Sequence, residues 1–145
     1  MEIINEFRLN LDSKSVNEGF SRSVVSAFAT QLDPTLEEIS DIKMAVSEAV
    51  TNCIVHAYPQ TVGKIYIHCQ IIEKNTLKIS IRDKGCGIAN IKQAMEPLFT
   101  TLGGERAGLG FAVMENFTDK ITVRSIINKG TTVTMFKKIH GRASL

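Results

Sequence analysis

Residues 47–58, SEAVTNCIVHAY, lie near the end of a predicted helix and give the clearest indication of the fold. Apolar residues recur with helical spacing from about Pro34 to His56, at Ile39, Ile42, Val46, Ala49 and Cys53. Asp33 is suited to cap the start of this helix, and Pro34 fits its first position. The segment therefore predicts an amphipathic helix over about 34–56 that buries one face.

A polar ridge runs beside that apolar face. Glu48, Asn52 and His56 are spaced four residues apart, so successive side chains are turned by only about 40° around the helix. A partly desolvated carboxylate at Glu48 can act as a base, and the amide oxygen of Asn52 can hold a metal ion. The alternative is that these residues mark the solvent edge of an amphipathic helix.

The segments around this helix alternate polar and apolar residues, which predicts strands over 7–11, 64–72, 77–82, 120–127 and 131–139. Helical spacing recurs over about 15–32 and 109–117, and a short helix is predicted near 91–95. Because the strands and helices do not alternate strictly, the expected fold class is α+β. We expect a two-layer sandwich with a mixed, mostly antiparallel sheet and the helices packed on one face.

The composition bounds the class of protein. The chain has 145 residues, of which 43% are hydrophobic and 22% charged, and this predicts a single globular domain over residues 1–145. A net charge of +2 gives no indication of nucleic-acid binding, and no apolar run reaches the roughly 18 residues of a membrane span. The first ten residues lack the pattern of a signal peptide, and the three cysteines form no metal-binding pair. We therefore expect a cytoplasmic protein without nucleic-acid or membrane partners.

A carboxylate lies where the strand over 77–82 ends. Asp83 has the same strand parity as the apolar residues of that segment, so its side chain is expected to point toward the core. An unpartnered carboxylate is costly there, which predicts a polar ligand such as an adenine amino group. Gly85 and Gly87 allow the backbone to turn sharply and approach a flat ligand. The alternative is a strand that ends in an ordinary Asp-x-Gly turn.

Glycines also cluster between residues 103 and 110, ahead of a predicted helix. Free amides at a helix N-terminus suit phosphate, so Gly108 and Gly110 are candidate phosphate-binding positions. The pattern is not a P-loop, because Gly108 is not followed by Lys and Ser or Thr. The long segment that contains Thr101 and Arg106 is either a lid over a ligand or a plain surface loop.

The order of these motifs resembles that of the GHKL ATP-binding superfamily, which includes gyrase, mismatch-repair ATPases and sensor histidine kinases. The matching motifs run from about residue 40 to 135, and they are Glu48-x-x-x-Asn52, Asp83-x-Gly85-x-Gly87, Gly108-x-Gly110 and Gly130-Thr131. The last of these needs no ligand when it is taken alone as a hairpin turn. Within the superfamily, the stretches SEAVTNCIVHAY, PLFTT and ERAGLGF are similar to those of the anti-sigma-factor serine kinases. The resemblance implies a GHKL (Bergerat) sandwich with an ATP site, Mg²⁺ and a mobile lid.

The resemblance also implies roles for individual residues. Glu48 would be the catalytic general base, and Asn52 would hold Mg²⁺ together with the phosphates. Asp83 would accept the adenine amino group. The other ATP-binding positions would be Gly85, Gly87, Thr101, Arg106, Gly108, Gly110, Thr131 and Thr132. Arg22, on the polar side of the first predicted helix, would face a partner protein.

The implied function is a protein serine/threonine kinase with two protein partners. It would bind and inhibit a sporulation sigma factor, phosphorylate the anti-anti-sigma factor on a serine, and form a homodimer through its first strand and helix. Three alternatives are an ATPase module in which Glu48 activates water, a detached histidine kinase catalytic domain, and a binding protein with a vestigial ATP site. The segment over 15–32 contains no histidine to accept phosphate, which disfavours the second alternative.

Overall fold

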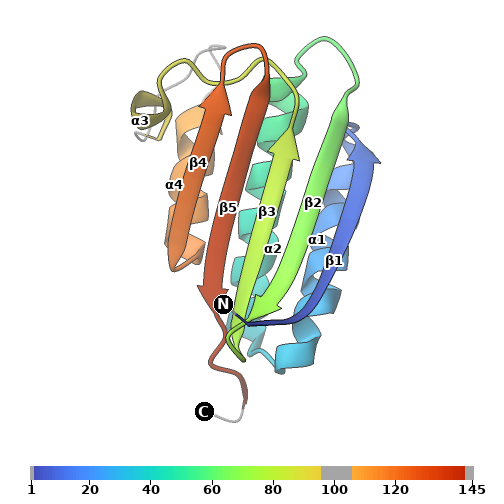
Figure 1. Cartoon of the computed structure of the whole chain (residues 1–145), viewed down its shortest axis with the longest axis vertical. Coiled ribbons are helices and arrows are strands. Elements are labelled where there is room, and N and C mark those ends of the chain that lie inside the picture. Colours follow the sequence, from blue (N-terminus) through green and yellow to red (C-terminus); the bar gives the residue numbers. More distant parts are fainter. Residues whose placement is uncertain (1, 96–105, 143–145) are drawn as a thin grey trace.

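The computed structural model describes residues 2–95 and 106–142, in which helices cover one face of a five-stranded sheet (Figure 1). The strands are β1 (Ile3–Asp12), β2 (Lys64–Ile72), β3 (Thr76–Asp83), β4 (Lys120–Ile126) and β5 (Gly130–Lys138). The helices are α1 (Val16–Ala29), α2 (Leu36–Asn52), α3 (Ile91–Ala94) and α4 (Arg106–Phe117), with a 3₁₀ helix at Thr30–Leu32 and a π-helical turn at Cys53–Ala57. Within these described residues, no helix combines the length and the apolar character needed to cross a membrane.

The sheet has the strand order β1-β2-β3-β5-β4, and every pairing of neighbours is antiparallel. The predicted two-layer α+β architecture is confirmed. The sheet is not mixed in the described part of the chain, because the β4–β5 hairpin adds to β3 in antiparallel register. The three inner strands β2, β3 and β5 alternate buried and more exposed residues along most of their length, and β4 alternates half-buried and exposed residues, so one face of the sheet is packed and the other is open.

The hydrophobic core lies between that packed face and α2, with α1 and α4 on either side of α2 (Figure 1). The sheet contributes an inner layer of nearly inaccessible side chains, among them Ile65, Ile67, Ile79, Ile81 and Met135. The helix contributes Ile42, Val46, Ala49 and Cys53, four of the five residues of the predicted apolar face. Burial of this layered apolar surface is what holds α2, and the polar ridge it carries, against the end of β3.

The start of α2 differs from the prediction. The N-cap is Thr35, whose hydroxyl accepts a hydrogen bond from the Glu38 N–H, while the Glu38 carboxylate accepts one from the Thr35 N–H. Asp33 instead has a left-handed backbone, with φ of 49°, and closes the preceding 3₁₀ helix. The prediction that Asp33 caps the helix and Pro34 opens it is therefore wrong, because the reciprocal capping box two residues later satisfies more of the free amides.

The end of α2 also departs from a regular helix. The chain passes at Cys53 into a π-helical turn, in which the Tyr58 N–H donates to the Cys53 carbonyl at 3.1 Å. Such turns are frequent at functional sites. This one lies where α2 faces the end of β3, so it shapes the region in which the predicted site residues meet.

Candidate nucleotide-binding site

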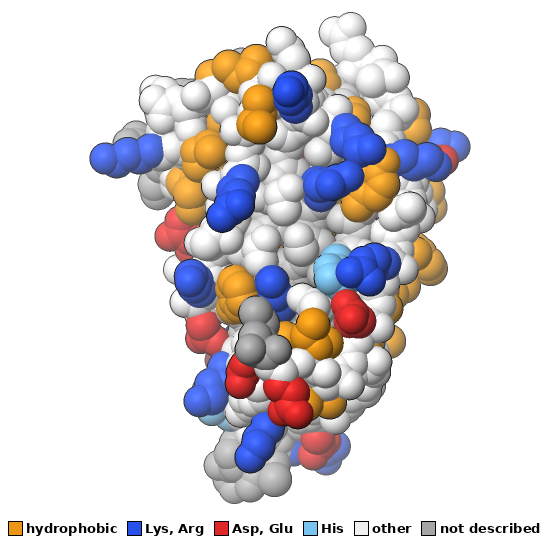
Figure 2. Space-filling model, in the orientation of Figure 1, with side chains coloured by type: hydrophobic (Ala, Val, Ile, Leu, Met, Phe, Trp, Pro, Cys, Tyr) orange, Lys and Arg blue, Asp and Glu red, His pale blue; other side chains and the backbone are white. Residues whose placement is uncertain are grey.

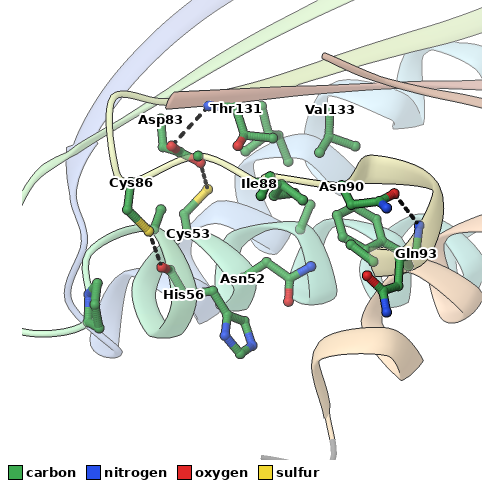
Figure 3. Close-up of a pocket in the computed structure, with 18 residues that line it drawn as sticks. Asn52, Cys53, His56, Asp83, Cys86, Ile88, Asn90, Gln93, Thr131 and Val133 are labelled. Carbon is green, nitrogen blue, oxygen red and sulfur yellow. Dashed lines mark hydrogen bonds between the residues drawn. The ribbon is translucent and has the colours of Figure 1, made fainter. Parts of the chain in front are cut away.

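A cavity of about 470 Å³ lies between α2 and the end of the sheet (Figure 3). Asp83 and Thr131 border it on the sheet side, and Asn52, Cys53 and His56 border it on the helix side. The remaining wall comes from the segment over 86–94, together with Phe111 of α4. A deep hollow with a mainly apolar lining and a few convergent polar groups is typical of a small-molecule site.

Asp83 points into the interior and is only 6% exposed. Its Oδ1 atom accepts hydrogen bonds from the Gly85 N–H at 3.0 Å and the Thr131 N–H at 3.2 Å, and its Oδ2 atom accepts one from the Cys53 thiol at 3.6 Å. Burial raises the pKa of Asp83, and these hydrogen bonds offset part of that rise. Burial and the nearby Asp83 carboxylate also raise the pKa of the Cys53 thiol, so it stays protonated as a donor. The lone pairs of Oδ2 that the long thiol contact does not use are therefore available to a ligand amino group.

Asn52 and Glu48 lie against the start of α4. A Cβ atom added to Gly110 would lie 3.1 Å from Asn52 Oδ1 and 3.4 Å from Glu48 Oε2, so α4 can approach this closely only because residue 110 is glycine. The Nδ2 atom of Asn52 is buried and has no hydrogen-bond partner among the described residues. An unsatisfied buried amide is costly, which indicates that a ligand completes its hydrogen bonding.

A magnesium ion fits this donor set. Among the residues that the structure describes, no three His, Cys, Asp or Glu side chains come together as a metal site. Mg²⁺ keeps several waters and takes few protein ligands when it binds substrate phosphates, so the amide oxygen of Asn52 beside the cavity fits a site completed by phosphate and water.

The segment over 86–94 forms a cavity wall that the sequence reasoning found only at Gly87. Gly87 has a φ of 76°, which favours glycine, and lines the cavity. Asn90 caps α3 by accepting a hydrogen bond from the Gln93 N–H at 3.0 Å, and both side chains border the cavity. The Asn-x-x-Gln spacing is a cap signal that was available in the sequence.

Among the predicted positions, Glu48 and Gly110 lie beside Asn52 without lining the cavity, and Gly85 and Thr132 do not border it either. A Cβ atom on Gly85 would collide with the Ala57 carbonyl, so this glycine allows packing against the end of α2 rather than approach to a ligand. Thr132 pairs with Arg82 and lies on the open face of the sheet. The structure therefore does not bring Gly85 and Thr132 into the cavity lining with Asp83 and Thr131. Thr131 does border the cavity, and its hydroxyl lies 2.7 Å from that of Ser125.

The other predicted positions fall elsewhere. Gly108 lies in the first turn of α4 rather than before the helix, which begins at Arg106 instead of residue 109. Thr101 and the side chain of Arg106 lie outside the described residues. Arg22 lies on α1, away from the cavity, and its guanidinium pairs with Glu18 at 3.0 Å.

Comparison with known proteins gives the family. Residues 12–137 match the family model described as the histidine kinase-like ATPase domain. A relative named anti-sigma F factor, from Thermoanaerobacter sp. (strain X514), is 56% identical over 96% of this chain and 97% of its own. Another of the same name, from Geobacillus thermodenitrificans, is 48% identical over 93% of both chains. The chain therefore belongs to the anti-sigma F factor family of histidine kinase-like ATPase domains, a domain type that binds ATP.

Solved structures show the same fold at low sequence identity. The RsbU and RsbW domains of a Mycobacterium tuberculosis protein align with a TM-score of 0.68 and 19% identity, over 93% of this chain and 32% of that one. The catalytic domain of the histidine kinase ThkA aligns with a TM-score of 0.56 and 18% identity, over 96% of this chain and 98% of that one. The GHKL architecture predicted from the motifs is thus confirmed.

Proposed function

We propose that this protein is a cytoplasmic, ATP-dependent serine kinase that inhibits a sporulation sigma factor and phosphorylates the anti-anti-sigma factor that opposes it. The observation that carries this proposal is the cavity in which the Asp83 carboxylate and the unsatisfied amide of Asn52 face one ligand space beside Glu48. The names of the relatives supply the sigma factor as a partner class. Nucleotide state would select the partner, with ATP favouring the sigma factor and ADP the antagonist.

In the proposed reaction, each residue has a distinct task. Asp83 receives the adenine amino group, and Thr131 holds Asp83 in place through its backbone N–H. Gly110 lets the start of α4 approach Asn52 and Glu48, and the family motifs assign Gly108 and Thr101 to the phosphates. Magnesium, when bound, neutralises phosphate charge, and the amide oxygen of Asn52 is the protein ligand that holds it.

Glu48 acts as the general base. It takes the proton from the serine hydroxyl of the partner while the serine oxygen forms a bond to the γ-phosphorus and the bond to the β-phosphate oxygen breaks, releasing ADP. Its position one helical turn before Asn52 places a carboxylate beside the cavity rather than inside the adenine pocket.

The test uses labelled ATP with Mg²⁺, with and without the antagonist protein. Transfer of label to a partner serine supports the proposal, whereas release of phosphate into water alone supports the ATPase alternative. We predict that Glu48→Gln retains ATP binding while transfer falls about 100-fold or more, because a general base contributes that much. Glu115→Gln, which changes an exposed carboxylate on α4, is the matched control. Unchanged transfer in Glu48→Gln would disprove the base assignment.

We also propose a homodimer formed through β1 and α1, with Arg22 facing a partner. β1 is an edge strand of the sheet, and Ile3, Ile4, Val16 and Phe20 expose apolar side chains on these two elements. Analytical ultracentrifugation of the wild-type chain and of Phe20→Ser would test this homodimer. We expect the wild type to sediment as a dimer and Phe20→Ser to dissociate more readily. A monomeric mass for both proteins would contradict the interface.

A further inference from the structure

The open face of the sheet carries a second hollow, on the opposite side from the nucleotide cavity. Its volume is about 320 Å³, and it lies over the end of the sheet where β3, β5 and β4 are neighbours. Four cationic residues border it, namely Arg82, Lys84, Arg124 and Lys129. Figure 2 shows blue side chains around a paler central strip of this face. We call this hollow, with its four cations and Thr132, the basic groove.

The four cations of the basic groove have no acidic partner among the described residues. On the far edge strand β1, Glu6 and Asp12 each already pair with a basic neighbour on β1 or β2. The charge of the basic groove is therefore available to an external anion, although the whole chain carries a net charge of only +2.

Aromatic rings hold part of this charge in position. The Arg82 guanidinium lies 5.0 Å and the Lys84 ammonium 5.2 Å from the centre of the Tyr66 ring. Further along the same face, Lys78 and Lys120 lie 5.7 Å and 5.6 Å from the centre of the Phe136 ring. These contacts restrict the cations to the sheet surface, so less side-chain freedom is lost when they bind a partner.

We propose that the basic groove is a docking surface for an acidic segment of a partner protein. Nucleic acid fits less well, because the faces of both aromatic rings are taken by the protein's own cations and cannot stack on bases. The four cations are exposed and spread around an open hollow, which suits several carboxylates rather than one small anion. Ile126 borders the same hollow and is 61% exposed, so it offers an apolar contact that a protein segment can cover.

This site goes beyond the proposed kinase function. A partner held on the open face leaves the nucleotide cavity uncovered, since that cavity lies between the sheet and α2. The two hollows are back to back and share Asp83 and Thr131 in their walls. A partner in the basic groove and a nucleotide in the cavity can therefore be bound at the same time. A variant that loses binding at one site is not required to lose binding at the other.

The test titrates the full isotope-labelled chain with a peptide of about twelve residues in which glutamate alternates with serine, followed by NMR. A peptide with glutamine in place of glutamate is the charge control. We expect amide shifts along the open face of β3, β5 and β4, with an affinity that falls as salt is raised. Arg124→Glu combined with Lys129→Glu should weaken binding about tenfold or more through lost and reversed charge. Lys14→Glu combined with Lys43→Glu changes the net charge equally at exposed positions outside the groove, and it should retain most of the affinity.

Several results would overturn the proposal. Equal loss of affinity in the two double variants would show that only the overall charge matters. Displacement of the peptide by ATP would place it in the nucleotide cavity instead. Tighter binding of an oligonucleotide or of anionic vesicles through the same residues would assign the surface to another class of partner, and the same shifts with inorganic phosphate alone would reduce it to a small-anion site. Self-association that is lost only in Arg124→Glu with Lys129→Glu would make a second copy of the chain the occupant.

Discussion

Asp83 divides its two carboxylate oxygens between the protein and the cavity. Oδ1 receives two backbone N–H groups, which fix the carboxylate at the end of β3, and Oδ2 has only the long contact from the Cys53 thiol. In Asp83→Asn the amide oxygen must remain with the two N–H donors, so the amide nitrogen replaces Oδ2. A donor would then face both the thiol and the ligand amino group.

We therefore expect Asp83→Asn to fold normally but to bind ATP about 10- to 100-fold more weakly, the range for loss of a hydrogen bond to a charged group. Titration calorimetry measures the affinity, and circular dichroism the fold. Asp33→Asn makes the same chemical change at an exposed turn outside the cavity and should bind ATP as the wild type does. Equal ATP affinity in Asp83→Asn would remove this residue from the site.

The three cysteines differ in reactivity because their surroundings differ. Cys53 and Cys69 are buried and Cys86 is exposed. Burial raises the pKa of the Cys69 thiol to about 12, and burial with the adjacent Asp83 raises the pKa of the Cys53 thiol well above its ordinary value. Since the thiolate is the reactive form, brief treatment with iodoacetamide near pH 8 should modify Cys86 alone. Peptide mass spectrometry identifies the modified residue; rapid labelling of Cys53 in the folded protein would contradict the described packing.

At the scale of the elements, Glu38 joins the start of α2 to the end of the chain. Its carboxylate accepts hydrogen bonds from the N–H groups of Thr35, His140 and Gly141. Burial alone would raise the pKa of Glu38, but these hydrogen bonds together lower it. One side chain thus closes the capping box and anchors the segment that follows β5, which fixes the end of α2 that is far from the cavity.

Glu38→Ala should lower the free energy of unfolding by about 2–3 kcal/mol, through loss of the cap and of buried hydrogen bonds. Because the folded pKa is lowered, the contribution is complete above the ordinary value of 4.5 and declines as the pH falls through the folded value. Urea unfolding at several pH values measures both effects. Glu37→Ala, at an exposed neighbouring position, should cost little. If the free energy of unfolding varies with pH in the same way in the wild type and in Glu38→Ala, then the titration of Glu38 is not linked to stability.

For the whole molecule, the sequence predicted what depends on local periodicity. Alternation located all five strands, and the parity of Asp83 predicted its inward direction. The sequence did not predict features that depend on competition between two possible cap residues or on contacts between residues far apart in the chain. Asp33 and Thr35 both suit a cap, and only the partnership with Glu38 decides between them. Thr131 and Thr132 are consecutive residues of β5 and so lie on opposite faces, and the parity of Thr131 with the buried Val133 and Met135 was a local signal for its inward direction that the prediction did not use. The Cys53 contact with Asp83 joins residues 30 positions apart and has no local signal.

Ligand binding at the cavity should stabilise the entire domain, because the cavity joins α2 to β3 and β5 across the core. At an ATP concentration about 100 times the Kd, linkage gives roughly 2.7 kcal/mol. For a domain of this size, that corresponds to a rise in Tm of about 5–10 °C. We expect most of this rise to require Mg²⁺ and to disappear with a chelator, since the amide oxygen of Asn52 is the proposed protein ligand of the ion. Asn52→Ala should therefore show a small rise that is the same with and without Mg²⁺, whereas Asn116→Ala, at an exposed site on α4, should behave as the wild type. Because thermal unfolding is followed without any turnover, a full Mg²⁺-dependent rise in Asn52→Ala would disprove the metal assignment whatever the kinase activity proves to be.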